Sequence, residues 1–185
     1  MNDDIKAGNL LIADPFLKDP NFQRTVVLLC DHQAETGSIG FVINRKYGKT
    51  VGELISQLET CALPVYYGGP VQTDTIHFLH TCPHLITDGL SIGNGIYWGG
   101  DFATAAQLLR NNEIETGDIR FYLGYSGWGV AQLADEMKEK TWLTTEANIK
   151  LVFHKNVSFI WQDSIRQLGG EYEQLNHYPI DPQLN

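Results

Sequence analysis

Residues 119–138 have the sequence IRFYLGYSGWGVAQLADEMK, and we expect the rest of the chain to pack around this stretch. The segment Ile119–Leu123 predicts a buried β-strand, which a glycine-rich turn at 124–129 follows. From Val130 onward, apolar residues recur at i, i+3, i+4 and i+7, which predicts an amphipathic helix that starts at Gly127. Glycines in the first turn of a helix cost about 1 kcal/mol each relative to alanine. Close packing against a strand or close approach of a ligand would each explain them.

Composition and charge narrow the class of protein. The 185 residues include 13 Lys and Arg against 22 Asp and Glu, a net charge of −9, which disfavours direct nucleic-acid binding. The N-terminus lacks a signal-peptide pattern, and no apolar run approaches the ~20 residues of a membrane-spanning helix. We therefore expect a soluble cytoplasmic protein without a membrane partner. Cys30, Cys61 and Cys82 are far apart and odd in number, which favours reduced structural thiols over disulfides.

The order of the expected elements indicates an α+β fold. Strands are predicted at 9–13, 26–30, 39–43, 65–67, 75–81, 96–98, 119–123 and 142–144, with one more short strand within the loop 83–95. Helices are predicted after the caps Thr50 (about nine residues) and Asp101, and at 147–153 and 158–168, where Gly169 is the stop. Because helices do not separate the strands regularly, we predict one domain over 1–185 with a mixed, largely antiparallel sheet or barrel-like core flanked by helices. Its core is expected at about 8–170, with a loosely attached polar tail at 171–185.

Ser126 invites comparison with the G-x-S-x-G nucleophile elbow of hydrolases. Trp128 stands where that motif requires glycine, and no His and acid pair is singled out as its partners, so we predict no catalytic residues. We favour Ser126 as the N-cap of the following helix. His77, His80 and His84 are clustered in sequence, but strand geometry points the first two to opposite faces. We therefore predict structural histidines and no metal site.

Two sets of residues are candidates for binding. Backbone amides at a helix N-terminus attract anions, which predicts a site at Ser126, Gly127, Trp128 and Gly129, with tight packing as the alternative reason for the glycines. A second polar set flanks the first hairpin and either rims a cleft or hydrogen-bonds loops: Arg24, His32, Asn44 and Arg45. Neither a Walker lysine nor a G-x-G-x-x-G motif is present, so no nucleotide cofactor is expected.

Several segments together resemble the YqgE/AlgH family of bacterial proteins. They are GNLLIADP (8–15), DPNFQRTV (19–26), His32, GFVINR (40–45), GGPV (68–71), GGD (99–101) and GYSGWGVAQL (124–133). The resemblance covers about residues 8–170. Two residues depart from the family pattern: Lys46 replaces a usual proline, and Ala131 a usual glycine.

The resemblance implies a compact α+β fold in a cytosolic bacterial protein and brings no established enzymatic activity. Family members are commonly labelled transcriptional regulators, although no helix-turn-helix or basic recognition helix is evident in this sequence. We therefore expect a noncatalytic regulatory or binding protein that recognises a small anionic ligand or a protein partner. The alternative is a hydrolase-like enzyme with a cleft beside Ser126.

Overall fold

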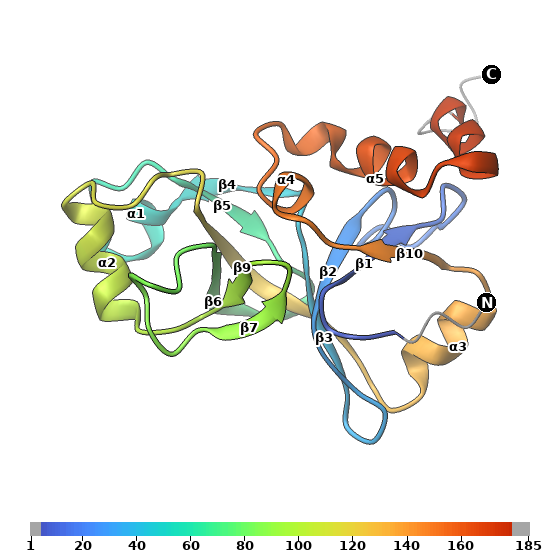
Figure 1. Cartoon of the computed structure of the whole chain (residues 1–185), viewed down its shortest axis with the longest axis horizontal. Coiled ribbons are helices and arrows are strands. Elements are labelled where there is room, and N and C mark those ends of the chain that lie inside the picture. Colours follow the sequence, from blue (N-terminus) through green and yellow to red (C-terminus); the bar gives the residue numbers. More distant parts are fainter. Residues whose placement is uncertain (1–4, 179–185) are drawn as a thin grey trace.

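A long central strand, β9 (Ile119–Trp128), organises the computed structural model, which describes residues 5–178 (Figure 1). The other strands are β1 (Asn9–Ala13), β2 (Val26–Gln33), β3 (Gly37–Val42), β4 (Lys46–Thr50), β5 (Pro64–Tyr67), β6 (Val71–His80), β7 (Leu90–Gly93), β8 (Ile96–Trp98) and β10 (Trp142–Glu146). The α-helices are α1 (Val51–Leu54), α2 (Phe102–Arg110), α3 (Gln132–Lys138), α4 (Ile149–Val152) and α5 (Ile160–Leu168). Short 3₁₀ helices lie at η1 (Ser56–Leu58), η2 (Val157–Phe159) and η3 (Gly170–His177).

The strands form a ten-stranded, mostly antiparallel sheet. Its order is β10-β1-β2-β3-β9-β6-β8-β7, and β5 lies off this path, parallel to β9 and antiparallel to β4. The first half of β9 pairs with β5 and β6, whereas its last three residues pair with β3. The α+β fold in one domain is confirmed, and the sheet path is open rather than a closed barrel.

Both faces of the sheet are covered. On β1 and β2, even-numbered residues such as Leu10 and Leu28 face a core shared with α4 and α5, while odd-numbered residues such as Leu11 and Val27 face α3. Figure 1 shows α4 and α5 on one side of these strands and α3 on the other. The continuous apolar runs of the sequence are thus those of strands buried twice. At the far end of the molecule, α1 and α2 pack on β5, β6 and β9 around a separate cluster that includes Phe121.

The predicted start of the helix after β9 is wrong. Gly124 takes φ +66° and bends the strand instead of ending it, so Gly127 and Trp128 remain in the ladder opposite Ile39 and Ser38. Helix α3 begins only at Gln132, after Ala131. Ser126 is therefore a buried strand residue and not an N-cap, and residues 126–129 are not the first turn of a helix.

Most other helix predictions are right in place and too long in extent. The Thr50–Glu53 capping box is present, but α1 ends at Leu54, and a 3₁₀ turn replaces the second half of the predicted nine residues. Asp101 caps α2 by accepting the Ala103 N–H at 3.0 Å. The predicted helix at 147–153 is the single turn α4, and α5 ends at Gly169, whose φ is +67°.

The described part of the tail packs on the core. In η3, Tyr172 and Leu175 contact the cluster beneath α5, so the prediction of a loosely attached tail is wrong for this part; residues 179–185 lie outside the described ones. Between residues 5 and 178, no helix is long and apolar enough to cross a membrane.

Candidate binding groove

The bend in β9 depends on backbones that touch. A Cβ built on Gly124 would lie 2.6 Å from the carbonyl oxygen of Gly69, and one on Gly68 would lie 2.3 Å from the carbonyl oxygen of Gly124. Real Cβ atoms do not approach backbone this closely. Close packing therefore accounts for these three glycines.

Packing does not account for the next two glycines along the chain. A Cβ on Gly127 would meet only the ring edge of Tyr125 at 3.3 Å and the Val71 side chain at 3.8 Å, and the φ of Gly127 is not positive. A Cβ on Gly129 would have its nearest neighbour, the Gln132 side chain, at 3.9 Å. Gly129 therefore has room for a side chain, and Gly127 would admit a Cβ once the Tyr125 ring shifts by a few tenths of an ångström.

The bare surface at Gly127 lies in a groove of about 450 Å³ between the β2–β3 hairpin and β9. The hairpin contributes Asp31, Thr36, Gly37, Ser38 and Ile39, and the opposite wall consists of Val71, Tyr125, Gly127 and Trp128. A groove of this size falls within the range of about 300–1,000 Å³ typical of ligand sites. Two of the four residues predicted for binding, Gly127 and Trp128, thus line a concave surface.

A β-bulge in β2 brings a carboxylate to this groove. The register with β3 shifts between Leu29 and Asp31, so Cys30 is an additional residue on the bulged strand. Bulges of this kind redirect side chains, and Asp31 lines the groove. Among the described lining residues, Asp31 carries the one charged side chain, which makes the groove acidic. The neighbouring His32 contacts the hydroxyl of Ser38 through Nδ1 at 2.7 Å.

The wall formed by Trp128 is fixed from behind by a shared carboxylate. The indole N–H groups of Trp128 and Trp142 both donate to Oε2 of Glu136, at 2.9 Å and 2.7 Å, and Gln132 donates to Oε1 at 2.9 Å. The side-chain oxygen of Gln132 in turn accepts the N–H of Gly129 at 3.0 Å. One of the amides predicted to bind an anion is therefore already hydrogen-bonded within the chain.

Ser126 lies beneath the groove and does not reach it. Its side chain is fully buried, and its hydroxyl donates to the carbonyl oxygen of Gly68 at 3.1 Å. Across residues 5–178 the structure records no histidine or carboxylate hydrogen-bonded to this hydroxyl. A nucleophile needs both access and a base, and Ser126 has neither.

The polar set around the first hairpin divides into two places. Arg45 donates to the carbonyl oxygens of Pro20, Asn21 and Gln23, and so holds the loop before β2. Asn44 extends the ladder by accepting from the Val26 amide and donating to the Arg24 carbonyl. The Arg24 guanidinium stacks 4.1 Å from the Trp161 ring centroid. His32 lies near the other end of the hairpin, so these four residues do not rim one cleft.

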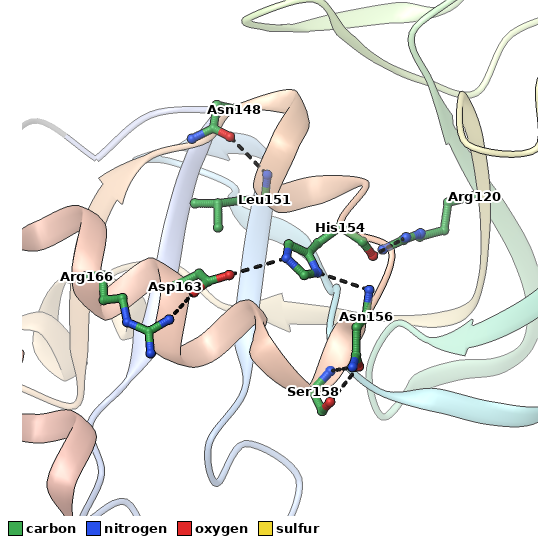
Figure 2. Close-up of polar contacts among 8 residues, drawn as sticks. All are labelled: Arg120, Asn148, Leu151, His154, Asn156, Ser158, Asp163 and Arg166. Atoms are coloured by element: carbon green, nitrogen blue, oxygen red, sulfur yellow. Dashed lines mark hydrogen bonds and ion pairs between the residues drawn. The ribbon is translucent and has the colours of Figure 1, made fainter.

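An Asp–His pair lies away from the groove, between α4 and α5 (Figure 2). His154 accepts the Asn156 N–H at Nδ1, 3.0 Å away, so its Nε2 carries the ring proton toward Asp163 at 3.3 Å. Asp163 also pairs with Arg166, and Arg120 donates to the carbonyl oxygens of Val152 and His154. The His154–Asp163 pair thus joins the segment after α4 to α5, and Arg120 ties that segment to β9.

The histidines of β6 point to opposite faces, as predicted. The ring of His77 lies among Phe41, Trp98 and Tyr125, and burial lowers its pKa. On the other face, His80 accepts the Cys82 N–H at Nδ1, so Nε2 donates to the Gly99 carbonyl oxygen. Burial lowers the pKa of His80 as well, against the opposing effect of that carbonyl.

Residues 10–173 match the AlgH-like family DUF179. The chain belongs to this AlgH-like family. A UPF0301 protein of Chlorobium limicola is 40% identical over 183 residues, which is 99% of this chain and 97% of that protein. A UPF0301 protein of Bacteroides fragilis is 40% identical over 180 residues, which is 96% of this chain and 90% of that protein.

Two solved structures share the AlgH-like fold. The solution structure of the AlgH protein from Pseudomonas aeruginosa superposes with a TM-score of 0.74 at 28% identity and covers 97% of each chain. The crystal structure of protein DIP2367 from Corynebacterium diphtheriae gives a TM-score of 0.77 at 18% identity, with 96% of this chain and 95% of that chain covered. The second likeness shows the fold alone.

Of the nine residues that line the groove in this AlgH-like protein, seven were not among the predicted site residues. Asp31 and Tyr125 line it, and neither residue stood out in the sequence. No local pattern marks the bulge at Cys30, and the pairing of Ile39 with Gly127 joins segments that are far apart in sequence. Gly127 and Trp128 were predicted as binding residues because they lie in the glycine-rich segment 124–129.

Proposed function

We propose that this AlgH-like protein is a noncatalytic binding protein of the cytoplasm, and that the groove between the β2–β3 hairpin and β9 holds its partner. The observation that carries the proposal is the open space at Gly127. Glycine within a strand costs about 0.5–1 kcal/mol relative to alanine. Since the nearest neighbours of a Cβ there would be side-chain atoms and no backbone, we infer that this cost keeps the groove free for another molecule.

The lining favours a cationic group over an anion. Asp31 supplies a carboxylate, Tyr125 supplies an aromatic side chain that can contact a guanidinium or ammonium group, and the chain as a whole carries −9. The predicted small anion stays untested, but the lining offers it no cation, and α3 starts beyond these residues. We assign the groove to an extended basic segment of a partner protein.

This assignment also separates the proposal from its two rivals. The hydrolase-like alternative needs an accessible nucleophile, and Ser126 is sealed beneath the groove. Direct DNA binding is disfavoured because the acidic groove and the net negative charge of the chain would repel the phosphates of DNA. A role in transcriptional regulation would accordingly pass through a protein partner.

Amide chemical shifts test this proposal with two defined peptides, acetyl-GRGRGR-amide and acetyl-GEGEGE-amide, titrated at fixed ionic strength. We expect saturable shifts at residues 31, 36–39 and 125–128 with the arginine peptide alone. Asp31→Asn should weaken its binding about tenfold, the loss of one charge-assisted contact. Glu35→Gln, on the exposed turn of the same hairpin and outside the lining, is the matched control.

Three outcomes would contradict the proposal. Saturation by the glutamate peptide would restore the anion prediction and overturn the cationic assignment. Shifts that map to other surfaces, or no saturable shifts with either peptide, would remove the groove as a binding site.

A further inference from the structure

A second cavity lies far from the groove, where the segment 58–63 faces the C-terminal end of α2. Its volume is about 500 Å³, which is in the range of a small organic ligand. The apolar floor belongs to the cluster that α1 and α2 share with the sheet. Figure 1 shows these two helices at the end of the molecule away from α3. Leu58 and Ile114 are buried there, and Leu63 and Leu109 are partly buried beside them.

Backbone hydrogen bonds hold both walls in place. Val51 N–H donates to the Leu63 carbonyl oxygen at 2.8 Å and Gly52 N–H to that of Cys61 at 3.0 Å, which fixes the first wall to α1. On the second wall, the N–H groups of residues 111, 112 and 113 donate to the carbonyl oxygens of Gln107, Leu109 and Leu108, respectively. The cavity is therefore preformed, which reduces the entropy cost of binding.

Among the described residues of the lining, Arg110 carries the one charged side chain, and its guanidinium only donates hydrogen bonds. Arg110, Asn112, Thr60 and Thr116 line the cavity, and the last-turn carbonyls of α2 are already satisfied. Within residues 5–178 the guanidinium of Arg110 has no hydrogen-bond or ion-pair partner. Glu59, Glu113 and Glu115 are adjacent to lining residues in sequence but are not part of the lining.

We propose that this cavity binds a small amphiphilic carboxylate, with the apolar part on the Leu58–Ile114 floor and the acid group on Arg110. An apolar floor recognises a hydrocarbon or aromatic body, and a guanidinium recognises a carboxylate through paired hydrogen bonds. The site does not depend on the β9 groove.

Cys61 provides a reporter inside the cavity. It lines the site and is half-buried, whereas Cys30 and Cys82 are buried, so an alkylating reagent should reach Cys61 first. The probes are 4-phenylbutanoate and 4-phenylbutanamide, which share a shape and differ in charge. Alkylation by iodoacetamide is followed by mass spectrometry of the intact protein, with the site confirmed on peptides. We expect saturable protection by the acid, and by the amide only at about tenfold higher concentration.

Two arginine variants give a matched comparison, because Arg110 and Arg166 each lie in the last turn of a nine-residue helix. Arg110→Gln should remove the advantage of the acid over the amide, and Arg166→Gln, with the same change in net charge, should keep it. Gly127→Val should leave protection of Cys61 unchanged, which separates this site from the groove. Absence of saturable protection, equal protection by both probes, or an acid preference that survives Arg110→Gln would each overturn the proposal.

Discussion

The hydroxyl of Ser126 donates to the carbonyl oxygen of Gly68 at 3.1 Å, and this bond ties β9 to the segment between β5 and β6 where the strand bends. The same carbonyl accepts the amide of Val42 at 2.8 Å, so β3 and β9 are both joined to the β5–β6 segment at one oxygen atom. The serine that resembles a nucleophile in the sequence is thus a structural donor beneath the groove.

Replacing this serine tests its structural role. Ser126→Ala should lower the free energy of unfolding by about 1 kcal/mol, the net value of one buried hydrogen bond, since the Gly68 carbonyl keeps its second partner. Urea denaturation measures the change. Ser56→Ala, at an exposed position of η1, should stay within about 0.5 kcal/mol of wild type. Labelling of Ser126 by a fluorophosphonate probe would contradict the structural assignment.

The two kinds of glycine in β9 should respond differently to the same substitution. Gly124→Ala forces a Cβ against the Gly69 carbonyl at positive φ and should destabilise the protein by about 2–4 kcal/mol. Gly127→Ala meets only side-chain atoms and should stay within about 1 kcal/mol of wild type. Thermal and urea denaturation of both variants provide the comparison, and equal destabilisation by both would refute the distinction.

Ala131 occupies a left-handed backbone conformation, with φ +63°, at the start of α3. Because a Cβ is strained there, Ala131→Gly should raise the free energy of unfolding by about 0.5–1 kcal/mol. Ala134→Gly, on an exposed position inside the same helix, should lower it by about 1 kcal/mol. In urea denaturation, the same chemical change is expected to have effects of opposite sign at two positions three residues apart. A destabilised Ala131→Gly variant would show that this backbone conformation is not strained.

The strands could be predicted from the sequence more accurately than the bend in β9 and the loops between strands. The runs 10–13 in β1 and 26–30 in β2 are apolar at every residue because both faces of the sheet are covered there, and this signal is local. The bend at Gly124 is not encoded locally, because it depends on contact with Gly69, which is far away in sequence. Without knowledge of that contact, the glycine-rich segment is predicted to be the turn before a helix. Arg45 and Asn44 were found because they flank the hairpin, but their carbonyl partners lie in a loop that sequence alone does not place.

Stability should fall at mildly acidic pH because of the two histidines of β6, of which His77 is partly buried and His80 is buried. Burial lowers the pKa of His77 and His80 in the folded state, so the unfolded chain binds more protons once the pH falls below the ordinary value of about 6.5. Each ring then removes at most about 1.4 kcal/mol of unfolding free energy per pH unit. Urea denaturation between pH 7.5 and 5.5 should show this slope, and His77→Phe should reduce it. An unchanged slope in that variant would exclude His77 as a source.

We propose that the open space at Gly127 is a binding surface for a basic segment. If it is, filling that space should raise the dissociation constant of acetyl-GRGRGR-amide. Gly127→Val fills the groove, whereas Gly117→Val adds the same side chain at a glycine with no neighbour within 4 Å. We predict that Gly127→Val raises the dissociation constant at least about tenfold with the fold intact, and that Gly117→Val leaves it unchanged. A folded Gly127→Val protein that binds the peptide as tightly as wild type would contradict the account.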